Sequence, residues 1–395
     1  MALGFSILDI GSAKVVCLIC SKAGKNRFVV NGAGVTEYKG FRLSKFLDSE
    51  TLKKATEDAI IKAEDAAKRS VVGIFVSVPA SFSRIVLKKG VLSFANSHKV
   101  TYSDIDKLIE ASMPEEDIDG YTLMHSSPVS YIADGVEGRV LPEGKGTSEL
   151  ASVVAHGYVE DEFKRTVCEI LKDMQIRADL YIDSDLALAS FLIDADNCEN
   201  GAIMIDVGYF TTDVCYILNA AIVARKTIEV GGMHIANDLA YGLELPLDVA
   251  EGIKRRFVFA LDYDNSVATI KIKDAGIVLV EDEAVALIIE ARTEELINLI
   301  METIDSFNVD LHSKPIYLTG GGIALMRGTK EYMSSIMGVP IIDDMPKTPI
   351  MNSQNYASAF AAANFLVEKD NLSVVMTSER DHNSLGRRIK DFFSK

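Results

Sequence analysis

The sequence predicts an α/β fold made of two similar halves, because strand-like and helix-like patterns alternate along most of the chain. A repeated hairpin supports this prediction. FSILDIGSAKVVCLI at 5–19 and AIMIDVGYFTTDVCYI at 202–217 share an apolar strand, an Asp-x-Gly turn and a second strand. Two copies of one hairpin at the heads of two α/β stretches indicate a duplicated fold with a cleft between its halves.

The first half is expected to carry an inserted subdomain. Apolar spacing predicts a helix at 49–69, and an apolar run predicts a strand at 71–78 that ends at Pro79. The sequence pattern then changes: residues 83–158 contain strand-like runs, a short helix and a glycine-rich loop. The expected elements are a strand hairpin at 1–19, a helix at 49–69, strands at 71–78, 121–132 and 152–159, a helix at 103–112, a helix at 160–174, a strand at 178–182 and a helix at 186–192.

The second half opens at Gly201 and contains an insertion of its own. Its expected elements are helices at 233–242 and 247–257, a β-ribbon at 267–280, a long helix at 282–307, a strand at 315–319 and a helix at 356–367. The predicted parts of the chain are a first core subdomain (1–82 and 159–200) with its insertion (83–158), a second core subdomain (201–225 and 311–367) with its insertion (226–310), a flexible linker (368–384) and a terminal helix (385–395).

The two Asp-x-Gly turns have the chemistry of phosphate loops. Glycine lets the chain turn tightly so that backbone N–H groups face phosphate oxygens, and the aspartate can hold Mg²⁺ through water. One such turn is common in β-hairpins. Two at equivalent places, followed by a strand that runs into the glycine triplet of YLTGGGIALMRG (317–328), indicate a nucleotide site.

This constellation resembles the ATPase fold shared by actin, sugar kinases and heat-shock chaperones, in which two ribonuclease-H-like halves enclose a nucleotide cleft. Within that fold the whole chain is similar to the FtsA family of bacterial cell-division actin homologues. LDIGSAKVVCLI, the first insertion, IIEARTEELINLI (288–300) before IYLTGGG, and the basic tail carry this likeness. It implies a polymerising protein that binds ATP and Mg²⁺, with little or slow hydrolysis. It also implies a cytoplasmic protein on the inner face of the cell membrane at the septum, where it tethers the FtsZ ring and recruits membrane proteins of the division machinery.

The resemblance assigns site residues by their place in each motif. Those expected to contact nucleotide are Asp9, Gly11, Ser12 and Lys14 in the first phosphate loop, Asp206, Gly208, Thr211 and Thr212 in the second, Glu251 and Lys254 in an E-x-x-K helix against the ribose and base, and Gly320, Gly321, Gly322 and Met326 at the adenosine loop. Asp9 and Asp206 are also the candidates for holding Mg²⁺ or positioning water, and no catalytic base is assigned.

Two departures from the family pattern affect the expected chemistry. Tyr209 and Phe210 stand where the second phosphate loop usually has glycines, and we expect them to crowd the phosphates. Ser184 takes the place of the water-activating Glu or Gln, between Asp183 and Asp185. Serine is a poor base at neutral pH, so rapid hydrolysis is not expected unless an aspartate is recruited.

The partner implied by the resemblance is the C-terminal peptide of FtsZ, and the matching surface here includes Arg292. An equally good interpretation of Arg292 is a solvated arginine paired with Glu295, three residues further along the same helix.

The last eleven residues, LGRRIKDFFSK, predict an amphipathic helix on the membrane surface. Its apolar face comprises Leu385, Ile389, Phe392 and Phe393, and Arg387 and Arg388 are among its basic residues. The alternative is a terminal helix that docks on the protein's own core.

Composition narrows the classes of function. A formal net charge of −16 argues against nucleic acid as a partner. No apolar run approaches the roughly 20 residues needed to cross a bilayer, and the N-terminus reads as a strand rather than a signal peptide. Two alternatives stay open: an actin-fold ATPase or kinase that turns over nucleotide, and a scaffold of the pilus-assembly type.

Overall fold

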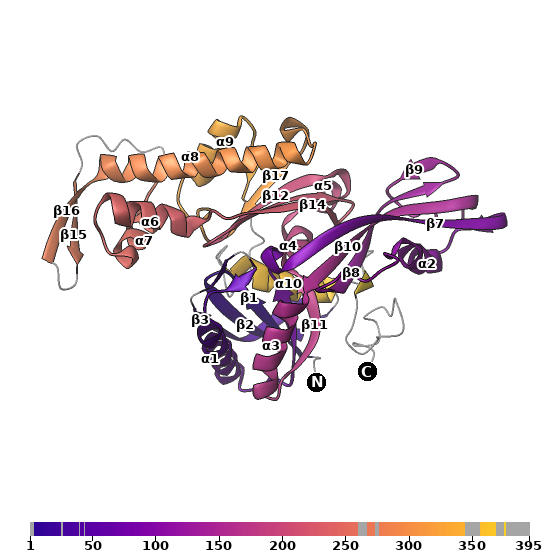
Figure 1. Cartoon of the computed structure of the whole chain (residues 1–395), viewed down its shortest axis with the longest axis horizontal. Coiled ribbons are helices and arrows are strands. Elements are labelled where there is room, and N and C mark those ends of the chain that lie inside the picture. The colour runs from indigo at the N-terminus through magenta and orange to yellow at the C-terminus, as the bar shows by residue number, and fades with distance from the viewer. Residues whose placement is uncertain are drawn as a thin grey trace. The chain divides into compact units, whose positions relative to one another are not determined.

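The computed structural model describes residues 4–24, 27–38, 40–42, 44–259, 267–272, 276–343, 356–368 and 375–376. The chain forms two compact units. The first contains 1–202, 215–225 and 356–395, and the second contains 203–214 and 226–355. Both units combine β-sheets with helices, as predicted (Figure 1).

The core of the first unit is a five-stranded sheet of order β11-β6-β1-β2-β3. Its strands are β1 (Gly4–Ile10), β2 (Lys14–Lys22), β3 (Phe28–Glu37), β6 (Gly73–Val78) and β11 (Arg177–Asp183), and the short pair β4 (Phe41–Arg42) and β5 (Lys45–Phe46) forms a separate ribbon. Strands β1, β6 and β11 are parallel, whereas β2 is antiparallel to both β1 and β3. The carboxyl ends of the parallel strands therefore bring Asp9, Ser77 and Asp183 to one edge of the sheet, which is where open α/β sheets bind ligands.

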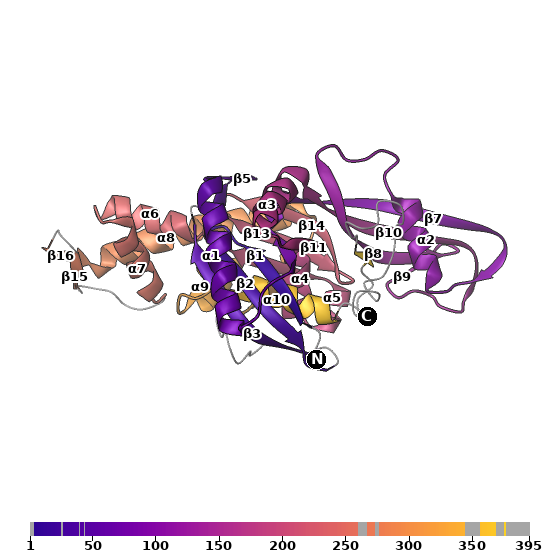
Figure 2. The same cartoon turned by 90° about the horizontal axis from the view of Figure 1, so that it is seen from below.

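Helices cover this sheet. They are α1 (Ser49–Ala67), α3 (Asp161–Asp173), α4 (Ser184–Leu192) and α10 (Ala357–Glu368). The short helix α5 (Ala195–Asn200) instead meets the turn between β13 and β14, where the Ala220 N–H donates to the Cys198 carbonyl. Helix α1 begins where the Asp48 carboxylate accepts the Thr51 N–H, and it packs on β2 and β3 (Figure 2). Glycine in β3 permits that contact, because a Cβ at Gly34 would lie 1.9 Å from the Ala59 carbonyl oxygen of α1.

Residues 83–160 form most of a second sheet of the first unit, in the order β19-β8-β10-β7. Its elements are η1 (Ala80–Phe82), β7 (Ser83–Lys99), α2 (Ser103–Ser112), β8 (Tyr121–Ala133), β9 (Val136–Gly138), β10 (Gly146–Glu160) and β19 (Val375–Met376). The two long strands β7 and β10 pair along their length, with α2 packed against them (Figure 1). Strand β19, which lies within the segment expected to be a linker, pairs with β8 at His125 and Ser126.

The second unit is built on a sheet of order β14-β13-β12-β17-β18. Its strands are β12 (Ala202–Val207), β13 (Thr212–Leu218), β14 (Ala221–Ile228), β17 (Ile316–Thr319) and β18 (Ile341–Ile342); residues 215–225 of β13 and β14 belong to the first unit. Strands β12 and β17 are parallel, with Asp206 opposite Thr319. Asp206 and the glycine triplet after β17 therefore share the carboxyl edge of this sheet.

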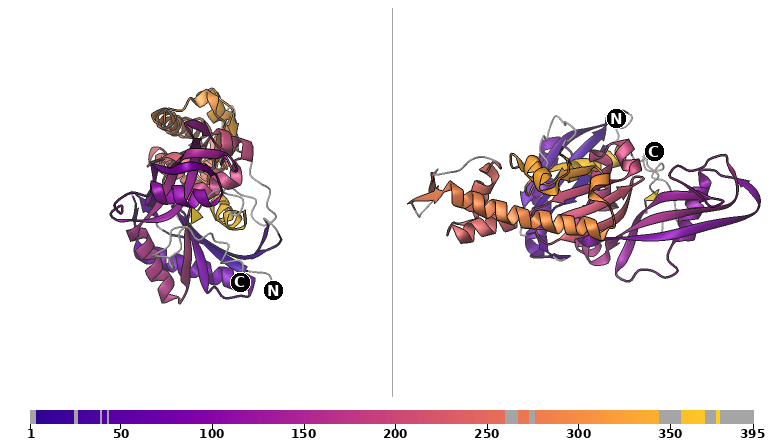
Figure 3. Two further views of the ribbon diagram at one scale, coloured as in Figure 1. Left: turned by 90° about the vertical axis from the view of Figure 1, so that its right-hand side faces the viewer. Right: turned by 90° about the horizontal axis from the view of Figure 1, so that it is seen from above.

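The remaining elements of the second unit are α6 (Gly232–Gly242), α7 (Leu247–Arg256), β15 (Val267–Ile272), β16 (Gly276–Glu281), α8 (Asp282–Ser306), η2 (Leu311–Ser313) and α9 (Thr329–Met337). The long helix α8 continues directly from the β15–β16 ribbon, as the right-hand view of Figure 3 shows. One apolar stripe of α8, which includes Ile289, Leu296 and Ile300, is buried.

Most helices and strands expected from the sequence are confirmed within one to three residues at each end. Strands β3, β7 and β14, helices α5 and α9, and several strands of two or three residues were not anticipated. Helix α10, expected to pack in the second core subdomain, instead packs on α4 and β1 in the first unit. Its small and apolar face, with Ala359, Ala362 and Ala363 buried, permits this close contact. Across the described ranges, every helix is too short or too polar to span a bilayer.

Candidate functional site

The first candidate phosphate loop is the two-residue turn between β1 and β2. The Gly11 N–H donates to the Lys14 carbonyl (2.9 Å), so Ser12 and Ala13 form the tip of the turn. The Tyr38 hydroxyl donates to the Gly11 carbonyl (2.8 Å) and closes the loop from the side.

Asp9 lies at the end of β1, where it is 8% exposed. It accepts a hydrogen bond from the Ser358 hydroxyl at 2.7 Å, so α10 contributes to this loop. Burial raises the pKa of Asp9, and the Ser358 hydrogen bond partly opposes that rise. The Lys14 ammonium lies 4.6 Å from the centre of the Tyr356 ring, just before α10. Asp9 and Lys14 thus place one acidic and one basic side chain beside the same turn.

The second candidate loop repeats the backbone of the first. The Gly208 N–H donates to the Thr211 carbonyl (2.8 Å), and Tyr209 and Phe210 form the tip. Their rings meet edge to face with centroids 5.0 Å apart. The sequence departure is therefore located at the positions that Ser12 and Ala13 occupy in the first loop.

Two glycine segments of the second unit pack against this loop. The N–H groups of Gly232 and Met233, at the start of α6, donate to the carbonyls of Gly208 (3.0 Å) and Tyr209 (2.8 Å). The Gly322 N–H donates to the Val207 carbonyl at 2.8 Å. A Cβ at Gly320 would lie 2.3 Å from the Asp206 Oδ1 atom, so only glycine fits there. The predicted second phosphate loop and adenosine loop are therefore in direct contact.

Several other predicted nucleotide contacts have structural partners in the second unit. The Thr212 hydroxyl donates to the Val230 carbonyl (2.8 Å). The Lys254 side chain is only 1% exposed, lies 2.8 Å from Glu251 and donates to the Gly232 carbonyl at 2.9 Å. Met326 is 4% exposed and packs in the core. These residues shape the loops around the glycines, and their contact with nucleotide stays a prediction.

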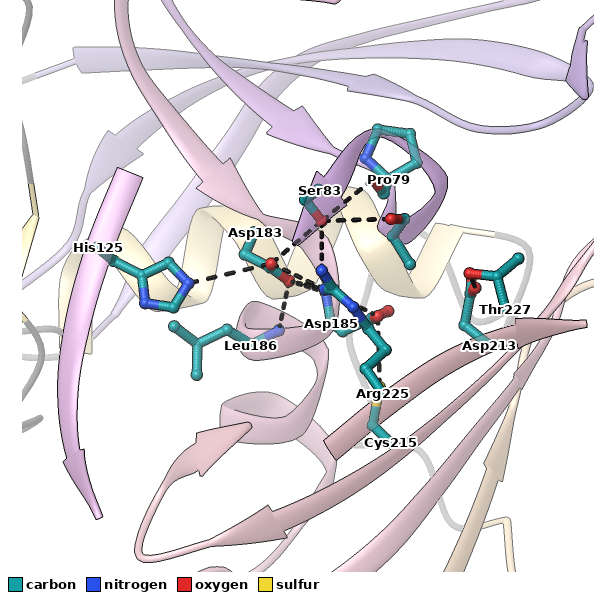
Figure 4. Close-up of polar contacts among 11 residues, drawn as sticks. Pro79, Ser83, His125, Asp183, Asp185, Leu186, Asp213, Cys215, Arg225 and Thr227 are labelled. Carbon is teal, nitrogen blue, oxygen red and sulfur yellow. Dashed lines mark hydrogen bonds and ion pairs between the residues drawn. The ribbon is translucent and has the colours of Figure 1, made fainter. Parts of the chain in front are cut away.

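Ser184 begins α4, and the aspartates on either side of it both form hydrogen bonds and ion pairs. Asp183 caps α4, since its Oδ1 atom accepts the N–H groups of Asp185 (3.1 Å) and Leu186 (3.2 Å). The Arg225 guanidinium of β14 contacts Asp183 at 2.8 Å and Asp185 at 3.3 Å, and it donates to the Ser83 hydroxyl at 2.6 Å. Figure 4 shows this group of side chains, with His125 on the far side of Asp183. We call Ser83, His125, Asp183, Asp185 and Arg225 the Arg225 cluster.

The cluster shifts the pKa values of its two carboxylates in opposite directions. Burial by itself raises the pKa of Asp183, but the Arg225 charge and His125 outweigh it and lower that pKa. Burial also raises the pKa of Asp185, and there the more distant Arg225 does not compensate. Neither aspartate is free to act as a general base for a water molecule beside Ser184. Asp183 accepts hydrogen bonds from two backbone N–H groups, the Arg225 guanidinium and the Ser83 hydroxyl, and Asp185 contacts Arg225 and the Cys215 thiol.

Arg292 is paired with carboxylates of the second unit. It lies 2.5 Å from Asp238 of α6 and 2.5 Å from Glu295, with 26% of its side chain exposed. The alternative interpretation from the sequence, a pair with Glu295, is thus confirmed. The predicted membrane residues Leu385, Arg387, Arg388, Ile389, Phe392 and Phe393 lie outside the described residues.

Sequence reasoning missed Arg225, Ser358 and Tyr38 as parts of these sites. Arg225 follows the apolar run AAIVA, and a charge next to such a run is a signal for a buried partner. Asp183 and Asp185, which also sit in an apolar stretch, fit that signal, but the sequence does not pair them with Arg225. Ser358 and Tyr38 carry no comparable local signal.

Comparison with known proteins agrees with this architecture. Residues 203–361 match the family model described as cell division protein FtsA. The FtsA protein of Neisseria meningitidis serogroup B is 25% identical over 348 residues, which cover 87% of this chain and 84% of that one. Among solved structures, a PilM–PilN type IV pilus biogenesis complex aligns with a TM-score of 0.60 at 14% identity, covering 93% of this chain and 99% of that one. MreB 5 of Spiroplasma citri bound to AMPPNP aligns with a TM-score of 0.55 at 15% identity, with 93% and 97% coverage. The chain is therefore similar to the FtsA cell division proteins over most of its length and has the actin-like fold.

Proposed function

We propose that this protein binds ATP with Mg²⁺, assembles into polymers and tethers the FtsZ division ring to the inner face of the cytoplasmic membrane at the septum. The observation that carries the nucleotide part is the pair of matching loops, each with a two-residue tip closed by one backbone hydrogen bond and preceded by an aspartate. The family match supports the role in division.

Asp9 and Asp206 suit a hard cation, because Mg²⁺ prefers carboxylate oxygens and retained water. Both lie at the carboxyl edges of their sheets, beside glycine turns. Bound Mg²⁺ would neutralise phosphate charge there. Gly11, Ser12, Lys14, Gly208 and Thr211 would contact phosphate, while Glu251, Lys254, Met326 and the glycine triplet would border the adenosine.

Hydrolysis is proposed to be slow. Ser184 lacks basicity, and Arg225 holds both neighbouring carboxylates. Steady-state phosphate release with Mg²⁺-ATP tests this: turnover well below about 1 s⁻¹ is expected, since ordinary enzymes reach 1 s⁻¹ or more. Faster turnover would favour the ATPase or kinase alternative. The likeness to PilM concerns the fold, and a pilus-type scaffold would not need the basic tail.

The membrane part of the proposal rests on the sequence of 385–395. Burying Leu385, Ile389, Phe392 and Phe393 can contribute at most about 1.5–3 kcal/mol each. Ordering the backbone opposes this by about 1–2 kcal/mol per residue, and each basic residue adds about 1 kcal/mol on anionic lipid. A single tail is therefore a marginal anchor, and polymers that link many tails bind strongly.

Liposome co-sedimentation tests the anchor with the intact chain, a truncation after Asn383 and Phe392→Glu. Both changes are expected to abolish binding to anionic vesicles by assembled protein. Unchanged binding after truncation would refute the anchor, as would equal binding by protein diluted until it is monomeric.

The FtsZ C-terminal peptide is proposed to dock on the second-half insertion near Arg292. Because Arg292 already pairs with Asp238 and Glu295, an acidic peptide would have to exchange with one of them. Arg292→Glu is expected to weaken binding of a labelled FtsZ peptide in a fluorescence anisotropy titration. Arg165→Glu is the matched control, since Arg165 forms the same i,i+3 pair with Glu162 on α3. Equal losses in both variants would remove Arg292 from the docking surface.

A further inference from the structure

The Arg225 cluster has an unbalanced buried charge. The side chains of Arg225, Asp183 and Asp185 are 5%, 0% and 1% exposed. With both carboxylates ionised, one guanidinium faces two negative charges. An uncompensated buried charge is expensive, and the usual response of a buried ionisable group is to change its protonation state.

His125 adds a second, independent observation. Its side chain is 1% exposed, and neither ring nitrogen has a hydrogen-bond partner among the described residues. Its Nε2 atom lies 3.9 Å from the Asp183 Oδ2 atom, so the ring is directed at the cluster (Figure 4). Gly157 of β10 makes room for this ring, because a Cβ there would lie 2.1 Å from the His125 Nε2 atom.

We propose that the Arg225 cluster stores one proton in the folded protein and acts as a proton-sensitive latch between β14 and the start of the inserted subdomain at Ser83. The link is the hydrogen bond from Arg225 to the Ser83 hydroxyl, the first residue of β7. This inference goes beyond the proposed nucleotide and membrane functions and does not depend on them.

Geometry assigns the proton to Asp185. The Oδ1 atom of Asp183 accepts two backbone N–H groups and the Arg225 guanidinium, which together stabilise a negative charge. Within the described ranges, the Asp185 carboxylate contacts the Arg225 guanidinium at 3.3 Å and accepts from the Cys215 thiol at 3.3 Å. Burial therefore raises the pKa of Asp185 and makes it the more easily protonated of the two carboxylates.

The surrounding elements offer few competing charges. On β10, His156 is hydrogen-bonded to Ser126 and Ser112, and burial lowers its pKa to about 4, so it is neutral. On α10, which packs against α4, the titratable residue is Glu368, which accepts a hydrogen bond from Asn364. Strand β13 carries Cys215, Tyr216 and Asp213, and Asp213 accepts a hydrogen bond from the Thr227 hydroxyl. Strand β8 contributes His125. The protonation state of Asp185 therefore decides how strongly the Arg225 N–H groups bind Asp185 rather than Asp183 and the Ser83 hydroxyl.

Loss of the proton strengthens the pull of Asp185 on Arg225. The guanidinium then shares its charge between two carboxylates, and its bond to Ser83 weakens. Because the closed cluster holds a proton that an opened, hydrated cluster lacks, opening becomes easier as pH rises. Each pH unit over which this difference holds changes the opening equilibrium tenfold.

The test is hydrogen exchange of the full-length protein at pH 5.0 and pH 7.5, after correction for intrinsic exchange rates. In the native sequence, peptides covering the start of β7 and β14 are expected to open about ten times more at the higher pH. Asp185→Asn, which mimics the protonated form, is expected to remove this pH dependence and retain the low-pH protection. Asp183→Asn is the matched control for Asp185→Asn. It is expected to reduce protection from hydrogen exchange at both pH 5.0 and pH 7.5.

Infrared spectroscopy of ¹³C-aspartate-labelled protein gives a readout that does not depend on the variants. A carboxylic acid band that disappears between pH 5 and pH 7.5 is expected in the native chain and in His125→Gln. The proposal is overturned if no such band titrates, if Asp185→Asn leaves the exchange pattern pH-dependent, or if only His125→Gln abolishes it.

Discussion

The hairpin turns after β1 and β12 share one backbone plan and differ in what surrounds them. In each, a glycine N–H donates to a carbonyl three residues later, and an aspartate stands two residues before that glycine. The first turn has a Ser–Ala tip and is supported by side chains, the hydroxyls of Tyr38 and Ser358. The second has a Tyr–Phe tip and is supported by the backbones of α6 and the glycine triplet.

This difference shows which features the duplicated hairpin requires. Both copies keep the glycine that closes the turn, whereas the tip accepts residues of any size because it is only half-buried. The contacts that hold the two turns differ in which substitutions they tolerate. A side-chain hydrogen bond can be lost without a clash, but backbone contacts made through glycine leave no space for a Cβ. The first loop is therefore adjustable, and the second is rigid.

The largest difference between the two loops is expected in the free energy of unfolding when a glycine beside each loop is replaced with alanine. Gly320 has φ +99°, and its Cβ would lie 2.3 Å from both Asp206 Oδ1 and the Val207 carbonyl oxygen. Gly320→Ala is expected to lower the free energy of unfolding by about 2–4 kcal/mol, from backbone strain and overpacking. At Gly11 the nearest atom would be 3.3 Å away, so Gly11→Ala should cost under about 1 kcal/mol. Urea titrations followed by circular dichroism compare them, and equal losses would contradict the contrast.

The second prediction concerns nucleotide affinity. Asp206→Ala is expected to weaken Mg²⁺-ATP binding at least tenfold, about 1.4 kcal/mol, while the fold stays intact because Asp206 lies at a strand end. Calorimetric titration of both proteins measures it. Asp213→Ala is the control, because Asp213 lies on the adjacent strand and binds Thr227 instead. Equal affinity in the Asp206 variant and the native chain would show that the second loop does not hold the metal.

The third prediction concerns pH and the first loop. Burial raises the pKa of Asp9, so this carboxylate costs stability as pH rises through that pKa, and the Ser358 hydrogen bond limits the cost. Ser358→Ala is expected to raise the pKa further and to lower the free energy of unfolding by about 1 kcal/mol where Asp9 is ionised. The loss should shrink as pH falls and Asp9 takes up a proton, which urea titrations at a series of pH values measure. Ser190→Ala, which removes a local bond to the Ala187 carbonyl, should show no such pH dependence.

Local patterns in the sequence predicted most of the fold because they report on burial within one element. The short helix α2 begins and ends at the residues expected, and the repeated hairpin correctly indicated the duplicated fold. Periodicity and turn chemistry are local properties, so a single sequence contains them.

Local sequence patterns could not predict contacts between residues that are far apart in the sequence. Ser358 meets Asp9 across 349 positions, and Arg225 meets Asp183 across 42. Helix α10 joined the first unit because its alanine-rich face fits against α4, which depends on the shape of a partner that the helix sequence does not specify. The glycines of β3 similarly matter only because α1 approaches them.

The smallest effect is expected from exchanging the tip of one loop for that of the other. Replacing Tyr209 with Ser and Phe210 with Ala gives the second loop the tip of the first and keeps the closing bond from Gly208 to Thr211. If the rings crowd the phosphates, affinity for Mg²⁺-ATP should rise several-fold, under about 1.4 kcal/mol. Loss of the edge-to-face ring pair should cost stability of about 0.5–1.5 kcal/mol, so thermal unfolding must be measured beside the calorimetric titration. Replacing both residues with glycine should tighten binding as well, but with greater loss of stability, because glycine also frees the unfolded chain. Weaker binding in both variants would show that the aromatic tip supports the ligand, and that the two loops diverged in function as well as in their supports.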